Sequence, residues 1–182
     1  MRLKKIGFYF SALIIFFLVS CNAYKNQNNN EVSDNRNDPP SDQLSSSNTF
    51  NLKVYKSATC GCCNDWIKHL EDSYFLVESI NKDNMSEIKD QFKVPFSKRS
   101  CHTAVSTQGY VFEGHIPAQF IHKFLENPPE DAIGLSVPAM PVGSPGMEMG
   151  ERFSPYQIIL MNKDGSETIF ANVQTQEEQY KK

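Results

Sequence analysis

Residues 50–63 read FNLKVYKSATCGCC, a strand-like alternation that runs into a cluster of three cysteines. Apolar and polar residues alternate over 50–55, which is typical of a β-strand with one buried face. The small residues at 57–59 favour a turn and a helix cap. We therefore expect a strand, a short loop and then a helix whose first turn carries Cys60, Cys62 and Cys63.

The residues that follow extend this pattern into an α/β fold. Cys63, Ile67 and Leu70 share one helical face at the spacing i, i+4, i+7. Periodicity, turn residues and proline positions predict the later elements. These are a strand over 74–80, a helix over 85–92, paired strands over 102–107 and 110–113, a helix from Pro117, and a hairpin of 156–161 with 168–170.

This order of elements is the thioredoxin-like layout, in which a central mixed β-sheet is flanked by helices. In that layout the loop before the third strand lies against the N-terminus of the first helix. Here that loop carries Cys101, so we expect Cys101 to meet the three earlier sulfurs. A Met/Pro/Gly-rich loop over residues 134–150 is an insertion in this fold.

The chain divides into four parts: a signal peptide (1–20), a disordered Asn/Ser-rich tether (21–49), the thioredoxin-like domain (50–173) and a polar tail (174–182) that is expected to fray. The apolar run of the leader is too short for a comfortable bilayer span. It ends in Leu18-Val19-Ser20-Cys21, which resembles a bacterial lipobox. We expect Cys21 to be lipidated and to anchor the protein in the bacterial cell envelope, facing the periplasm or the exterior. The alternative is an ordinary secretory signal.

Composition restricts the function classes. The chain has 182 residues and is 40% hydrophobic, which fits one ordinary domain with some chain left over. Its net charge is −3, and removal of the leader, which has three basic residues and no acidic one, takes it to −6. This acidity argues against binding to nucleic acid, because the phosphate backbone attracts basic proteins.

The cysteine motif leaves several interpretations open. Thiolates at a helix N-terminus should have lowered pKa values, which suits both redox chemistry and metal binding. Cys60 and Cys63 form the C-x-x-C of a thiol–disulfide oxidoreductase, which would be an enzyme. A zinc-stabilised interaction domain and a pair of structural disulfides are weaker alternatives. Adjacent Cys62 and Cys63 make two good disulfides geometrically awkward.

Copper is the metal that this donor set favours. Structural zinc sites usually take two separate C-x₂₋₄-C knuckles, and this chain has one knuckle, an extra sulfur and the distant Cys101. Soft thiolates suit Cu(I), and a cluster with equal numbers of Cu(I) ions and thiolates carries no net charge. We therefore predict several Cu(I) ions as cofactor, held by Cys60, Cys62, Cys63 and Cys101.

Other side chains are candidate ligands or packing residues. Three methionines in the irregular loop lack a helical pattern that would assign them to the core, and two histidines adjoin the motifs. The candidates for additional copper contacts are His102, His115, Met140, Met147 and Met149. We assign His69, His122, Met85 and Met161 to structural roles.

Four separated motifs resemble the CopG-type copper-resistance family, exported thioredoxin-like metal-binding proteins formerly known as a domain of unknown function. The motifs are YKSATCGCC (55–63), SCHTA (100–104), EGHIPA (113–118) and GLSVPAMP with GSPGME (134–148). The similarity spans about residues 52–161. Ala139 stands where glycine is expected before the Met-Pro pair, and the lipobox and long tether differ from a freely soluble periplasmic form.

The resemblance implies a polynuclear copper–thiolate cluster and a role in handling copper in the cell envelope. It points to Cys60, Cys62, Cys63 and Cys101 as the cluster ligands. The resulting hypothesis is an envelope copper-binding protein that sequesters Cu(I), interconverts Cu(I) with Cu(II), and passes copper to protein partners.

Overall fold

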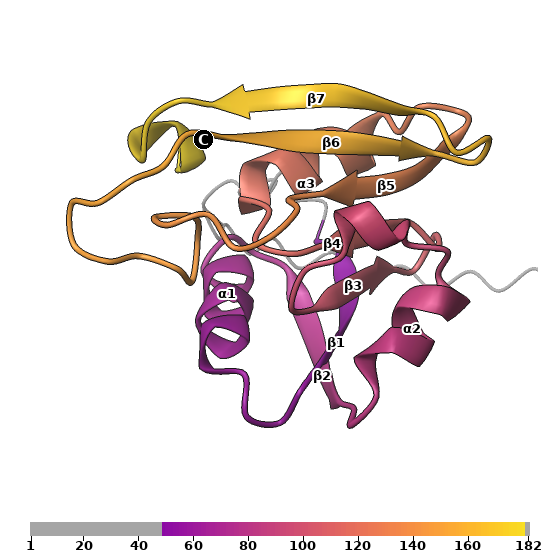
Figure 1. Ribbon diagram of the computed structural model, residues 1–182, viewed down its shortest axis with the longest axis horizontal. Coiled ribbons are helices and arrows are strands. Elements are labelled where there is room, and N and C mark those ends of the chain that lie inside the picture. The colour runs from indigo at the N-terminus through magenta and orange to yellow at the C-terminus, as the bar shows by residue number, and fades with distance from the viewer. Residues whose placement is uncertain (1–48, 181–182) are drawn as a thin grey trace, which may run out of the picture. The chain divides into compact units, whose positions relative to one another are not determined.

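The computed structural model describes residues 49–180, which form a seven-stranded mixed sheet with helices on its faces (Figure 1). The strands are β1 (Asn51–Lys56), β2 (Leu76–Asn81), β3 (Thr103–Ser106), β4 (Val111–Glu113), β5 (Ala132–Ser136), β6 (Tyr156–Asn162) and β7 (Glu167–Val173). The helices are α1 (Gly61–Glu71), α2 (Met85–Gln91) and α3 (Ala118–Glu126), with short 3-10 turns η1 (Phe96–Lys98) and η2 (Glu177–Gln179). The leader, the lipobox with Cys21 and the tether up to residue 48 lie outside the described residues.

The first four strands confirm the thioredoxin-like layout. They lie in the order β2-β1-β3-β4, with β1 and β2 parallel on either side of α1 in the sequence and β3 antiparallel to both β1 and β4. Helix α1 buries Cys63, Ile67 and Leu70, as their spacing predicted, together with Trp66. The Trp66 indole donates a hydrogen bond to the Ile116 carbonyl at 2.8 Å, which ties α1 to the segment that leads into α3.

Three further strands extend the sheet beyond β4. Strand β5 lies parallel to β4, and β6 and β7 form the predicted hairpin (Figure 1). The expectation of a loop from residue 134 is wrong for residues 134–136, which belong to β5. Gly134 lies within this strand and must be glycine, because a Cβ there would lie 1.8 Å from the Val111 carbonyl oxygen. Only glycine fits this close approach, so the segment lacks the usual strand pattern.

The polar tail is more ordered than expected. Gln179, in η2, is only 1% exposed. It accepts a hydrogen bond from the Tyr156 hydroxyl at 2.5 Å and donates one to the Gly143 carbonyl at 2.8 Å. The end of the described chain is therefore packed against the loop that connects β5 to β6. Within residues 49–180, no helix is long and apolar enough to cross a membrane.

Candidate metal centre

The CxCC motif, formed by Cys60, Cys62 and Cys63, lies where the loop after β1 leads into α1. Cys60 is the N-cap of α1, in extended conformation, and its side chain makes no capping hydrogen bond. Its backbone N–H donates to the Ser57 carbonyl at 3.1 Å, which closes the turn after β1. Cys62 and Cys63 follow in the first helical turn, where backbone N–H groups without an intrahelical acceptor favour negative charge. The motif thus presents sulfur at an electropositive helix end.

Two of the four cysteines form a disulfide. Cys60 and Cys63 are bonded, with their Cα atoms 5.3 Å apart. Cys62 and Cys101 are free thiols, and the Cys62 sulfur lies 3.6 Å from the Cys60 sulfur. Reduction of the Cys60–Cys63 bond is therefore required before all four sulfurs can act as ligands.

The fold brings the distant Cys101 to this motif. Cys101 precedes β3, and its sulfur and those of Cys60, Cys62 and Cys63 all lie within 4.8 Å of one another. This is the geometry that the thioredoxin-like layout predicted for the loop before the third strand. Four sulfurs at such separations are close enough to share metal ions.

Two histidines contact Cys101 and make what we call the ligand cluster: Cys101, His102 and His115. The Cys101 sulfur is 3.2 Å from His102 Nδ1 and 3.0 Å from His115 Nε2. His115 Nδ1 lies 2.8 Å from the Pro145 carbonyl oxygen, so Nδ1 carries the proton and Nε2 keeps a lone pair toward the sulfur. His102 Nε2 is buried and has no hydrogen-bond partner within residues 49–180.

Burial determines the protonation of the ligand cluster. It raises the pKa of the Cys101 thiol to about 12, and the nearby Cys62 thiol acts in the same direction. Burial likewise lowers the pKa of His102 and of His115, because a charged imidazole loses its hydration. The imidazoles are therefore neutral, the form that binds metal ions, whereas the Cys101 thiol must release a proton when it becomes a ligand.

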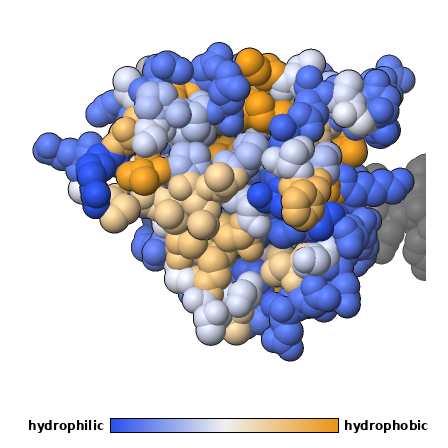
Figure 2. Space-filling view, in the orientation of Figure 1, coloured by the Kyte–Doolittle hydropathy of each residue, from blue (hydrophilic) through white to orange (hydrophobic). Residues whose placement is uncertain are grey.

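The methionine loop, residues 137–155, lies against the same helix end. A Cβ at Gly146 would come within 2.6 Å of the Cys62 carbonyl oxygen and 2.8 Å of the Trp66 backbone nitrogen. The backbone of the loop therefore packs directly on α1. Met147 follows and is half-buried, while Met140 and Met149 are about half exposed. Figure 2 shows hydrophobic surface gathered over α1 and the neighbouring loop.

Ala139, which stands where glycine was expected, has a backbone conformation that favours glycine. Its φ is +60°, in the left-handed region that favours glycine. The Ala139 carbonyl accepts a hydrogen bond from the Ser100 hydroxyl at 2.5 Å, which joins the methionine loop to the loop that carries Cys101.

A second buried group escaped the sequence analysis; we call Lys89, Thr103 and Glu113 the ion-pair cluster. Lys89 Nζ lies 2.5 Å from a Glu113 carboxylate oxygen, and their side chains are 6% and 0% exposed. The carboxylate also accepts hydrogen bonds from the Thr103 hydroxyl at 2.7 Å and from the Ser100 backbone N–H at 2.6 Å. The Glu113 carboxylate thus binds Ser100 and Thr103, which precede and follow Cys101 in the sequence. Glu113 itself lies two residues before His115.

The remaining histidines have structural partners. His69 Nε2 accepts a hydrogen bond from the Ala118 N–H at 2.9 Å, and His122 Nε2 donates to the Ser73 carbonyl at 2.9 Å. Met161 is 1% exposed and belongs to the core. These positions agree with the packing roles expected for them.

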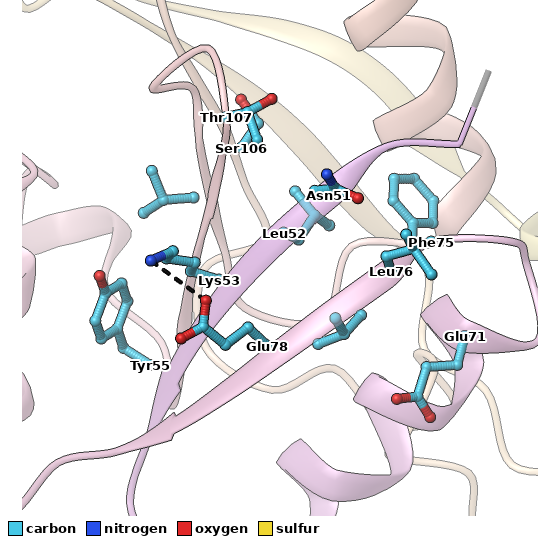
Figure 3. A pocket seen from close by; sticks show the side chains of 12 residues that line it. Asn51, Leu52, Lys53, Tyr55, Glu71, Phe75, Leu76, Glu78, Ser106 and Thr107 are labelled. Carbon is cyan, nitrogen blue, oxygen red and sulfur yellow. Dashed lines mark ion pairs between the residues drawn. The ribbon is translucent and has the colours of Figure 1, made fainter.

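A surface cavity of about 710 Å³ lies elsewhere on the sheet (Figure 3). It is lined mainly by residues of β1, β2 and the end of β3, together with Glu71 at the C-terminal end of α1. The ion pair of Lys53 and Glu78, 3.3 Å apart, crosses it. No cysteine or histidine is among its described lining residues. The cavity is therefore separate from the candidate metal centre.

Comparisons with known proteins assign the family. The model of a family described as "Protein of unknown function, DUF411" matches residues 98–147, which include Cys101 and both histidines of the ligand cluster. A solved structure of copper resistance protein CopG, form 2, has 43% sequence identity and a TM-score of 0.66, over 69% of this chain and 99% of that chain. The chain belongs to the CopG copper-resistance protein family.

A second CopG structure gives the same result. Form 1 has 44% identity and a TM-score of 0.65, and the match covers 69% of this chain and 98% of that one. Among curated proteins, the chain has no match. The likeness to CopG therefore extends over nearly the whole of the solved CopG chains.

Proposed function

We propose that this CopG-family protein handles copper by holding several Cu(I) ions in a thiolate cluster of Cys60, Cys62, Cys63 and Cys101. The observation that carries the proposal is the approach of these four sulfurs to within 4.8 Å of one another. Thiolates are soft ligands that bind Cu(I) strongly, and one thiolate can bridge two ions. The names of the similar solved structures, copper resistance proteins, support copper as the metal.

Charge also favours a thiolate cluster at this position. Cys63 is fully buried, and the other three sulfurs are partly buried, so isolated anionic sulfurs would be costly. Equal numbers of Cu(I) ions and thiolates cancel this charge. The helix N-terminus stabilises any excess negative charge on Cys62 and Cys63.

The disulfide supports a second candidate function, thiol–disulfide exchange by Cys60 and Cys63. The free Cys62 sulfur, 3.6 Å from the Cys60 sulfur, is close enough to exchange with this bond. In the same geometry, two Cu(II) ions would each accept one electron as the Cys60 and Cys63 thiolates form the disulfide. This reaction would give two Cu(I) ions and link copper redox chemistry to the motif.

Metal counting on the reduced full-length chain tests the proposal. We expect more than one Cu(I) per chain under anaerobic conditions against a competing chelator, with thiolate-to-copper charge-transfer absorption. Cys21→Ser is the matched control, because it removes a cysteine outside the cluster and should leave the count unchanged. Binding of one Zn(II) in preference to Cu(I) would instead indicate a zinc domain, and a reversible disulfide without metal binding would indicate an oxidoreductase.

We further propose that the protein acts at the bacterial cell envelope, anchored through lipidated Cys21. Acyl chains add roughly 0.8 kcal/mol of membrane affinity per buried CH₂, so a multiply acylated N-terminus would hold the domain firmly at the membrane. Cys21→Ser should move the protein from the membrane fraction to the soluble fraction. Retention of this variant in the membrane would contradict the anchor.

A further inference from the structure

The disulfide disables the four-thiolate set but leaves the ligand cluster intact. Neither Cys60 nor Cys63 belongs to that cluster, and its three candidate ligand atoms lie within 4.8 Å of one another. Cys101 is the one residue shared by both donor sets. The protein therefore carries two overlapping donor sets, one of which remains usable when the motif is oxidised.

The orientation of each imidazole suits metal binding at this cluster. His115 keeps its Nε2 lone pair toward the Cys101 sulfur because Nδ1 donates to Pro145. The His102 ring packs on Trp66, with centroids 4.2 Å apart, and nothing described in residues 49–180 hydrogen-bonds to its Nε2. The proton of neutral His102 is therefore free to reside on Nε2, which leaves the Nδ1 lone pair toward the sulfur.

We propose that the disulfide form of the protein binds one borderline divalent ion, of the Zn(II) type, through Cys101, His102 and His115. One thiolate and two imidazoles make a donor set typical of borderline ions, whereas four thiolates favour Cu(I). Three protein ligands would leave the fourth tetrahedral position to a ligand that the cluster does not supply. The oxidation state of the Cys60–Cys63 pair would then select which metal the protein holds.

The change of donor set is a two-electron reaction. An external dithiol breaks the Cys60–Cys63 bond, supplies two electrons and two protons, and becomes a disulfide itself. The thiols of Cys60 and Cys63 then lose protons as Cu(I) binds. Cys101 leaves the nitrogen-containing set to join the thiolate set. This step rests on the proposed Cu(I) function, whereas Zn(II) binding by the oxidised form does not.

The test uses the full-length chain with Cys21→Ser, which removes a competing thiol. The Cys60–Cys63 disulfide is verified by mass spectrometry, and Zn(II) is titrated anaerobically without reductant. Zn(II) is the probe because Cu(II) would oxidise the free thiols. We expect one saturable equivalent, release of a proton, and a shift of the ¹⁵N resonances of His115 Nε2 and His102 Nδ1.

Two variants separate the donor sets. His115→Gln should weaken Zn(II) binding by the oxidised chain at least tenfold while the reduced chain keeps its Cu(I) count, because all four sulfurs remain. Cys62→Ser, the matched control, should lower the Cu(I) count of the reduced chain and leave Zn(II) binding by the oxidised chain unchanged. Circular dichroism checks that each variant folds.

Three outcomes would overturn the proposal: no saturable Zn(II) equivalent on the oxidised wild-type cluster, unmoved histidine resonances on Zn(II) addition, or loss of Zn(II) binding in Cys62→Ser. The contacts to Cys101 would then be simple hydrogen bonds. The resonance measurement needs no substitution, so it decides the matter even if His115→Gln does not fold. Loss of Cu(I) binding alone would contradict the proposed function and leave the zinc site standing.

Discussion

The ligand cluster and the ion-pair cluster share two short stretches of the chain, residues 101–103 and 113–115, and both are largely buried, yet their polar atoms are satisfied very differently. Lys89 and Glu113 neutralise each other, and the carboxylate accepts two further hydrogen bonds. In the ligand cluster, His102 Nε2 has no partner in the described chain, and Cys101 faces two neutral rings. The difference indicates that one cluster holds the loops in place and the other keeps donor atoms available.

The largest expected effect is on the ion-pair cluster. Lys89→Met would leave the Glu113 carboxylate buried without a counter-charge, so we expect unfolding free energy to fall by about 3–5 kcal/mol. Urea denaturation of the metal-free protein measures this loss. Adding Glu113→Gln removes the charge and keeps one acceptor oxygen for the Ser100 N–H, while the new NH₂ group can donate to the Thr103 hydroxyl, so the double variant should recover much of the stability. No recovery would show that charge compensation is not what the pair supplies.

A substitution in the ligand cluster is expected to reduce copper binding and to leave the stability of the fold nearly unchanged. Cys101→Ser removes the soft donor at nearly constant size, so stability of the metal-free protein should change by less than about 1 kcal/mol. The bound Cu(I) count and the thiolate-to-copper absorption should both fall, because Cys60, Cys62 and Cys63 remain alone. An intact count and spectrum would contradict both the four-thiolate site and the distinction between the clusters.

The two clusters also differ in how far the sequence could predict them. Cys101 was predicted to meet the CxCC motif because the fold follows from local strand and helix patterns, and the topology then fixes which loop lies at the helix end. Lys89 and Glu113 are 24 positions apart, and in the sequence each resembles an ordinary exposed charge. Their pairing depends on how α2 packs on the sheet, which no local pattern reports.

The dependence on distant contacts also explains why the sequence did not predict strand β5 or the burial of Gln179. Strand β5 has only five residues, and Gly134 is at its centre because the strand approaches Val111 closely. Glycine in a strand interior removes the alternation that identifies strands. Gln179 is buried by hydrogen bonds to residues 143 and 156, which are distant in the sequence. The local sequence around Gln179 is polar and predicted a frayed end.

A smaller effect is expected from the three methionines of the methionine loop, whose backbone packs on α1 at Gly146. Thioethers are neutral and soft, so they release Cu(I) more readily than thiolates and suit an access route. Replacing Met140, Met147 and Met149 with Leu keeps the apolar volume and removes the sulfur. We expect slower copper loading, measured by stopped-flow absorption, with the cluster count retained. Unchanged stoichiometry, affinity and loading rate would reduce these methionines to packing residues.

The smallest expected effect tests the contact that joins the two loops at Ser100. The Ser100 N–H is held by Glu113, and its hydroxyl donates to the carbonyl of Ala139, whose φ of +60° is unfavourable for alanine. The left-handed conformation costs a non-glycine residue roughly 1–2 kcal/mol, while glycine loses about 0.5–1 kcal/mol more chain entropy on folding. Ala139→Gly should therefore raise the unfolding free energy by about 0.5–1 kcal/mol, measured by thermal or urea unfolding.

The copper count should not change in Ala139→Gly, because the substitution adds no donor and relieves strain that the loop already tolerates. Gly109→Ala is a useful comparison, since Gly109 also has a positive φ, +89°, and a Cβ there meets no atom within 4 Å. That variant should lose stability through backbone strain alone. If Ala139→Gly were destabilising, the left-handed conformation would not be what limits this loop, and Ser100 would be held chiefly by the ion-pair cluster.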